Sequence, residues 1–207
     1  MSANDVQARY IAPAASDDNG ISTAATLSGA GNLTIGGALA DGGSVTLTDA
    51  RNVIITSAGD DRGITFTVTG TDESGDAQTE VITGANAGVA TGTSYFTTIT
   101  QIAASGASAG NVEAGTGTAV AAEVTGNRVR LRGLQFVGNT TGGTVEFRTT
   151  GAAGSVIYKF DANNVDDTVY PSIPDGGIVG SAGAYLVYTQ TSLESLTVFY
   201  EGGHLSF

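Results

Sequence analysis

The sequence predicts an all-β protein, and three observations lead to this prediction. Residues 64–72, ITFTVTGTD, alternate between apolar side chains and threonine, the period of two expected of a strand with one buried face. Glycine accounts for 31 of the 207 residues, about twice the usual share. Turn-forming residues recur at intervals of about 8 to 12 positions, a spacing that is typical of a β-sandwich.

The first half of the chain contains seven expected strands, each rich in β-branched or apolar residues and bounded by turn-forming residues. They are residues 32–37, 44–49, 52–58, 64–72, 77–84, 94–105 and 111–124. Glycine, serine and threonine interrupt the alanine-rich tracts and disfavour helix there. A short helix near residues 11–25 is the one helical alternative that stays open.

The strand pattern restarts after VTGNR, residues 124–128. Six further strands are expected in the second half: residues 128–138, 143–151, 155–162, 167–179, 184–190 and 195–202. We therefore predict two β domains, an immunoglobulin-like β-sandwich over residues 21–125 and a smaller antiparallel β-sandwich or barrel over residues 126–207.

Residues 1–20 show little hydrophobic periodicity and end in the turn-type cluster SDDNG. We predict that they form an extended N-terminal arm. Tyr10 and Ile11 are its large apolar side chains, and they are expected to dock on a neighbouring subunit.

The composition disfavours several function classes. With 20 acidic and 8 basic residues, the net charge of −12 argues against nucleic acid and anionic membranes as partners. The absence of cysteine excludes disulfides and thiolate metal sites. No apolar run is long enough for a membrane span or a cleaved signal peptide, so synthesis in the cytoplasm is expected.

Two acidic clusters are candidate metal or catalytic sites. Asp72 and Asp76 bracket a loop that fails the EF-hand pattern, because its twelfth position is Thr83 rather than glutamate. A looser Ca²⁺ site that adds Asp60 or Asp61 is the alternative. We favour a hairpin turn at Ser74-Gly75 for the loop, with positive φ, and a solvated turn for the Asp60-Asp61 pair.

His204 is the only histidine, and a lone histidine near the C-terminus does not indicate a catalytic triad. It is expected to be a surface or subunit-contact residue. We predict no catalytic residue, no metal and no cofactor, and therefore a protein that is not an enzyme.

Arg128, Arg130 and Arg132 form the only basic cluster, and alternation places them on one face of a strand, opposite Val129 and Leu131. One interpretation is a docking stripe for acidic residues of a partner or a neighbouring copy. The other is a solvated strand face whose arginines pair across strands with acids such as Glu146.

Two long segments resemble a recurrent β-rich module in virion proteins of tailed bacteriophages. They are RNVIITSAGDDRGITFTVTGTDESGDAQTEVITG, residues 51–84, and TSYFTTITQIAASGASAGNVEAGTG, residues 93–117. The stretches GSVIYKFDA, IPDGGI and SLTVFYEG in the second half resemble the small terminal β domain of similar phage proteins.

This resemblance implies a non-enzymatic capsid decoration (cement) protein that binds the outside of the head shell and stabilises capsomer junctions. The implied partners are the major capsid protein and copies of the chain itself, as a homotrimer on the capsid exterior. A tail or fibre-type virion protein for adsorption is the alternative. A carbohydrate-binding module or hydrolase is a weaker one, because the chain has no tryptophan for a sugar platform.

Overall fold

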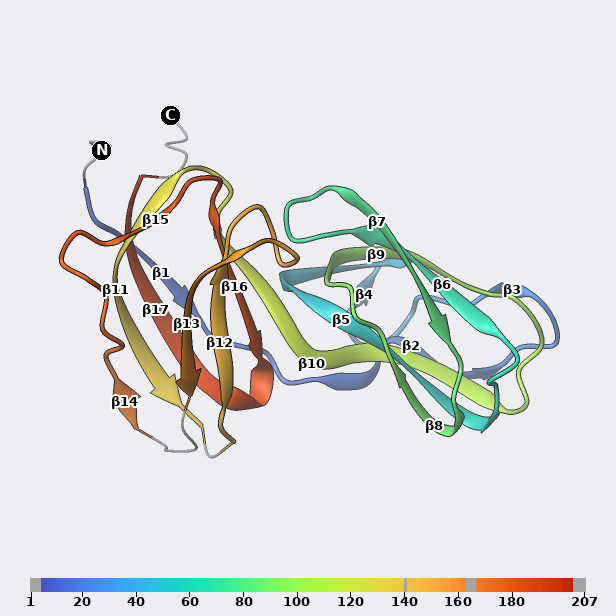
Figure 1. Ribbon diagram of the computed structural model, residues 1–207. Helices are drawn as coiled ribbons and strands as arrows, with labels where there is room; N and C mark the ends of the chain where they lie inside the picture. The colour runs from blue at the N-terminus through green and yellow to red at the C-terminus, as the bar shows by residue number, and fades with distance from the viewer. Residues whose placement is uncertain (1–4, 140, 163–166, 203–207) are drawn as a thin grey trace. The chain divides into compact units, whose positions relative to one another are not determined.

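The computed structural model of the chain describes residues 5–139, 141–162 and 167–202. These residues form strands almost throughout (Figure 1), which confirms the prediction of an all-β fold. No helix in the described part of the chain is long and apolar enough to cross a membrane. The elements are β1 Gln7–Ile11, β2 Asp17–Thr26, β3 Gly31–Asn32, β4 Ala40–Asp41, β5 Ser44–Asp60, β6 Thr65–Thr71, β7 Ala77–Thr83, β8 Asn86–Thr91, β9 Phe96–Ala104, β10 Asn111–Thr125, β11 Val129–Gly138, β12 Gly143–Arg148, β13 Val156–Ala162, β14 Thr168–Val169, β15 Ile178–Gly180, β16 Ala184–Thr189, the 3-10 helix η1 Gln190–Ser192, and β17 Leu193–Gly202.

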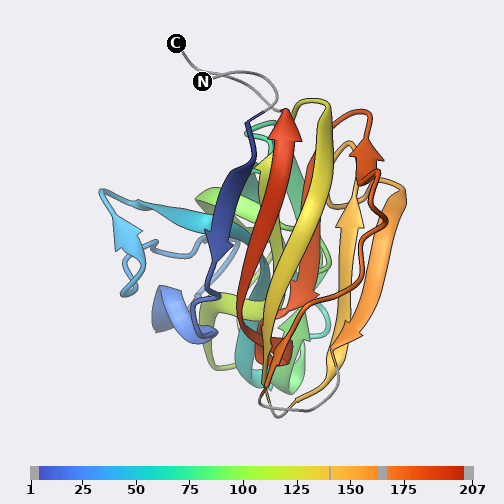
Figure 2. The ribbon, with the colours of Figure 1, turned by 90° about the vertical axis from the view of Figure 1, so that its left-hand side faces the viewer.

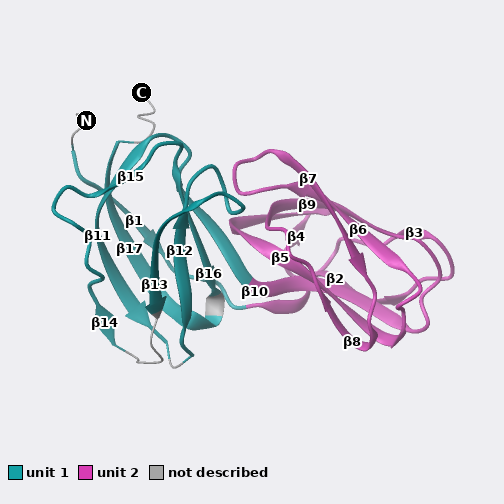
Figure 3. Cartoon of the chain, in the orientation of Figure 1, with its two compact units in different colours: residues 1–15, 119–207 teal, residues 16–118 magenta. Residues whose placement is uncertain are grey.

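The chain divides into two compact units (Figure 3). Unit 1 comprises residues 1–15 and 119–207, and unit 2 comprises residues 16–118. This division differs from the predicted one, which placed boundaries after residues 20 and 125. The difference arises because β10 is one continuous strand: its first part pairs with β2 in unit 2, and its second part pairs with β16 in unit 1.

The N-terminal segment does not follow the prediction of a separate arm. Strand β1 pairs antiparallel with β17, and Ile11 lies opposite Leu196. Ile11 is 2% exposed and belongs to the hydrophobic core of unit 1. Strand β2, Asp17–Thr26, occupies most of the region near residues 11–25 where a short helix was the alternative. The described residues before position 27 are therefore mainly sheet, held by long-range pairing.

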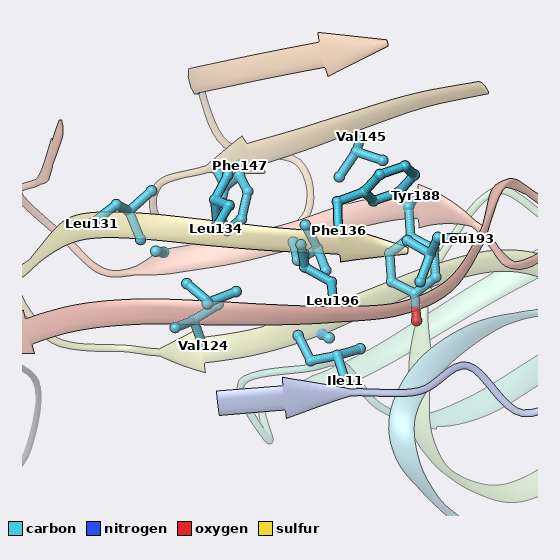
Figure 4. Packing of buried hydrophobic residues seen from close by; sticks show 14 of the residues in the cluster. Ile11, Val124, Leu131, Leu134, Phe136, Val145, Phe147, Tyr188, Leu193 and Leu196 are labelled. Carbon is cyan, nitrogen blue, oxygen red and sulfur yellow. The ribbon is translucent and has the colours of Figure 1, made fainter. Parts of the chain in front are cut away.

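Unit 1 contains two layers of strands. The first is a five-stranded sheet in the order β1-β17-β11-β14, in which β15 also pairs with β11. The second consists of β13, β12, β16 and the second part of β10. Figure 4 shows the core that both layers line, with Leu131, Phe136 and Leu196 from the first layer and Phe147 from the second. Two sheets that share one apolar core have the architecture of a β-sandwich.

Unit 2 is built around the path β5-β9-β6-β7. Strand β5 is long and irregular: its register shifts let its first part pair with β9 and its last part with β8. Strand β6 shows the predicted alternation, since Phe66 and Val68 are fully buried while the intervening threonines are half-buried. These two side chains pack with Phe96, Ile99 and other residues in a second hydrophobic core.

Candidate interface on the five-stranded sheet

The acidic loop between β6 and β7 is the tip of a hairpin, as predicted. The Asp72 carboxylate accepts main-chain N–H hydrogen bonds from Ser74 and Asp76, each 2.9 Å long. Gly75 has φ +85°, the left-handed conformation that glycine adopts without steric cost. Of the predicted Ser74-Gly75 pair, only Gly75 takes a positive φ. One oxygen of Asp72 thus organises the turn.

The Asp60-Asp61 pair splits into two different environments. Asp60 is exposed and accepts hydrogen bonds of 2.8 and 2.7 Å from the Arg62 guanidinium. The hydrogen bond from Arg62 lowers the pKa of Asp60 from 3.8 to about 2. Asp61 is 2% exposed, so the prediction of a solvated turn is wrong for this residue. Its Oδ1 accepts the Ala109 N–H at 2.7 Å, and its Oδ2 has no hydrogen-bond partner in the described structure.

Neither cluster gathers further ligands in the described ranges. Within residues 5–139, 141–162 and 167–202, no three His, Cys, Asp or Glu side chains lie close enough together to hold a metal ion. His204 falls outside the described residues.

The predicted alternation in β11 is present. Val129 and Leu131 are buried in the core of unit 1, whereas Arg132 is exposed and Arg130 is half-buried on the other side of the strand. Arg128 is exposed and directly precedes β11. The arginine cluster therefore lies at the outward side of the five-stranded sheet.

Two of these arginines already bind parts of their own chain. Arg130 donates to the main-chain carbonyl of Gly176, and Arg132 Nη1 donates to that of Asp175 at 3.2 Å. Arg132 Nε also lies 3.2 Å from Glu201 Oε1. The cross-strand acid is thus Glu201, which the sequence did not point to.

The acid named in the sequence prediction, Glu146, lies in the other layer of unit 1. It pairs with Arg148 at 2.5 Å and lies 3.8 Å from the Lys159 ammonium group. The prediction of Glu146 as a partner of the arginine cluster is therefore wrong. The strand order determines which acid lies near the arginines, because β17 and not β12 pairs with β11.

The predicted contact pair Tyr10 and Ile11 is divided between two faces. Tyr10 is 67% exposed, whereas Ile11 fills the core. Successive side chains of a strand point to opposite faces, so only one of two neighbours can reach a partner. Of the two residues, only Tyr10 therefore remains a candidate for contact with a partner.

A row of side chains links Tyr10 to the far edge of the same sheet. Residues directly opposite each other in a ladder share a face. Tyr10 lies opposite Thr197, which lies opposite Gln135 on its other side. Gln135 Nε2 lies 3.5 Å from the hydroxyl of Tyr170, which is 69% exposed. We call the side of the sheet that carries this row the outer face; Figure 2 views the sheet, with β1 in dark blue at its edge beside β17 in red and β11 in yellow.

The next positions along the strands extend the outer face. Phe199 lies opposite Ala8 on β1 and opposite Gly133 on β11. A Cβ atom at Gly133 would lie 3.5 Å from the Phe199 ring, so the ring rests beside a strand position without a side chain. Beyond it, Arg130 lies opposite Glu201. The outer face therefore joins aromatic residues to a charged end at which Arg132 and Glu201 pair.

Two buried polar side chains of unit 2, those of Arg51 and Asn52, bind the main chain. Arg51 is 4% exposed, and its Nε donates to the Gly117 carbonyl at 3.1 Å. Asn52 Nδ2 donates to the Gly92 carbonyl, also at 3.1 Å. The half-buried Glu80 carboxylate likewise accepts main-chain N–H groups from the turn between β8 and β9. These contacts satisfy main-chain groups that would otherwise lose hydrogen bonds on burial.

Comparison with known proteins gives no relative, since no protein family, curated protein or solved structure matches the chain. Three sequence-predicted contact residues, Tyr10, Arg130 and Arg132, lie on the outer face. Sequence reasoning missed Tyr170 and Phe199. Only the alternation in SLTVFYEG pointed toward an outward Phe199, and nothing local marked Tyr170. The chemistry of the outer face suits binding, with exposed aromatic rings, an amide and a paired charge.

Proposed function

We propose that this chain is a non-enzymatic structural protein of a tailed-bacteriophage virion, and that it decorates the outside of the head shell. In this role the outer face of unit 1 contacts the major capsid protein where capsomers meet. Binding to the assembled shell alone then stabilises the shell by mass action.

One observation carries the proposal. The segment that resembles the phage virion module, residues 51–117, falls within unit 2, residues 16–118. Its apolar residues, among them Phe66 and Phe96, form a core within that unit. The segment lies wholly inside this one unit, although Ile21, Leu33 and Val45 of the core come from the residues before it. A module that recurs in different proteins is expected to lie within one compact unit, so this placement supports the proposal.

The outer face supports the choice of contact surface. Tyrosine and arginine are enriched at the energetic centres of protein interfaces. Tyr10 and Tyr170 expose about two thirds of their surface, at 67% and 69%. Arg132 and Glu201 pair with each other, so docking there does not leave either charge buried alone.

Binding to shells that lack the protein tests the proposal. The Gln135→Ala/Tyr170→Ala double variant truncates two of the four side chains in the row that runs from Tyr10 across the outer face. We expect shell affinity to fall at least about tenfold, because two such truncations at an interface centre cost more than about 1.4 kcal/mol. Val81→Ala is the matched control, since Val81 is 63% exposed in unit 2 and should bind as the unmodified chain does.

Two results would contradict the proposal at different levels. Unchanged occupancy by the double variant would exclude the outer face as the contact surface. Failure of the unmodified chain to sediment with shells would exclude decoration itself.

A further inference from the structure

Strand β1 ends the five-stranded sheet. It pairs with β17 on one side, and no described strand pairs with its other side. The free edge of a strand can accept another strand through its main-chain N–H and C=O groups. Val6, Ala8 and Tyr10 occupy alternate positions beside this free edge, on the outer face of the sheet, and all three are exposed. On the outer face, the side chains along the free edge are therefore largely apolar and uncharged.

Three other edge strands, β7, β13 and β2, carry protective features that β1 lacks. At β7, side chains of Gln78 and Glu80 bind the turn that follows β8. Strand β13 exposes the charges of Lys159 and Asp161. At β2, Gly36, Gly37 and Leu39 donate main-chain hydrogen bonds to the strand. Covering segments and outward charges are the usual means by which proteins prevent strand addition.

We propose that β1 pairs antiparallel with β1 of a second copy of this chain, about a two-fold axis at Ala8. This register places Val6 of each copy opposite Tyr10 of the other, so apolar side chains meet. It places Gln7 opposite Arg9, so no like charges face each other. A symmetric strand pair of this kind is self-complementary and closed, as a two-fold interface requires.

The neighbouring registers are poorer. An axis at Arg9 sets the two Arg9 charges directly opposite each other, which destabilises a strand pair. An axis at Gln7 shortens the pair and leaves Tyr10 opposite position 4. With the axis at Ala8, residues 5–11 of both copies pair along their whole length. Arg9 does not oppose this arrangement, because it shares the inward side with Val198 and is half-buried.

The pairing joins the outer faces of two copies into one continuous surface. It stands independently of the virion role, because it concerns the isolated protein. It also differs from the homotrimer that the phage resemblance implies, so the mass of the assembly separates the two arrangements.

Cysteine cross-linking tests the register directly, because the chain contains no cysteine. In the Ala8→Cys variant the two thiols face each other across the axis. Opposed Cβ atoms lie about 4.5–5.5 Å apart, and a shift of about 1 Å between the two edge strands brings them to the about 3.5–4.5 Å that a disulfide needs. Val81→Cys on β7 is the control, since Val81 is also exposed, at 63%. We expect rapid covalent dimer formation by Ala8→Cys at micromolar concentration under mild oxidation, and at least about tenfold slower cross-linking of Val81→Cys.

Sedimentation equilibrium of the unmodified chain supplies a second readout. The expected mass is twice the 20.6 kDa of the chain. The Tyr10→Lys variant should sediment as a monomer, and its amide spectrum should show the same fold. A monomeric unmodified chain at about 100 μM, a trimer, an unaffected Tyr10→Lys dimer, or equal cross-linking of the two cysteine variants would each overturn the proposal.

Discussion

Replacing the buried Asp61 with alanine is predicted to destabilise unit 2. The side chain is 2% exposed, and its Oδ1 accepts the Ala109 N–H at 2.7 Å. This hydrogen bond ties the loop after β9 to the end of β5. Alanine removes the acceptor and leaves the loop without this attachment.

The expected magnitude follows from two opposing contributions. A hydrogen bond to a charged acceptor contributes about 1.5–3 kcal/mol. The buried Oδ2 has no hydrogen-bond partner in the described structure, so its removal relieves part of the desolvation cost. We therefore expect Asp61→Ala to lower the free energy of unfolding by about 2 kcal/mol. Asp61→Asn keeps an acceptor for Ala109 and nearly the same volume, so its cost should be about 1 kcal/mol or less.

Native-state amide hydrogen exchange measures both variants. The slowest amides of β5, β6 and β9 report the stability of unit 2, and the Ala109 amide reports the hydrogen bond itself. Asp76→Ala at the exposed hairpin tip is the control and should change stability by less than about 0.5 kcal/mol. An equally small loss in Asp61→Ala, or an Asn variant as unstable as the Ala variant, would refute this reasoning.

Three further predictions concern the cores, the surface ion pair and a tight strand contact. Phe66→Ala and Phe147→Ala each remove a fully buried ring from one core, and each should cost about 3–5 kcal/mol in its own unit; equal loss of exchange protection in both units would contradict separate cores. Arg62→Gln should return the pKa of Asp60 from about 2 toward 3.8, as carboxyl NMR shifts report. Because the folded-state pKa is lowered, the stabilisation by this pair is present above about pH 4 and is lost as the pH falls toward 2; an unchanged titration would exclude Arg62 as the cause. Gly70→Ala places a Cβ atom against the main chain of β9 and should cost at least about 2 kcal/mol by urea unfolding; a neutral effect would contradict the close approach of β6 and β9.

The sequence predicted the features that depend on local periodicity. Alternation in residues 64–72 and 128–132 identified strands β6 and β11 and the side chains that each buries. Turn chemistry identified the hairpin at Gly75, because positive φ is a property of the local chain. These predictions needed no knowledge of which strands become neighbours.

The features that the sequence did not predict depend on contacts between distant segments. Strand β1 is only five residues long, and its partner β17 lies at the other end of the chain. The pairing of β17 with β11 also selects Glu201 rather than Glu146 as the acid beside Arg132. Asp61 is buried because its carboxylate meets the loop at Ala109. The predictions of a separate N-terminal arm and of a solvated Asp61 were wrong because the sequence does not show these tertiary contacts.

The sequence predicted only some residues of the candidate interface, because the face itself depends on which distant strands pair. Tyr10 was predicted as a contact residue from its apolar character in the N-terminal segment, and Arg130 and Arg132 from their charge and alternation. Their presence on one face became visible only when β17 was found between their strands. Tyr170 joins them through the pairing of β14 with β11, which no local pattern indicates.

Cryo-electron microscopy of virions from the phage that we propose as the source of this chain tests the central claim most directly. The proposal predicts density for both β units on the head shell, with the outer face of the five-stranded sheet against the major capsid protein. Density on the tail alone, or virions that lack the chain, would contradict it.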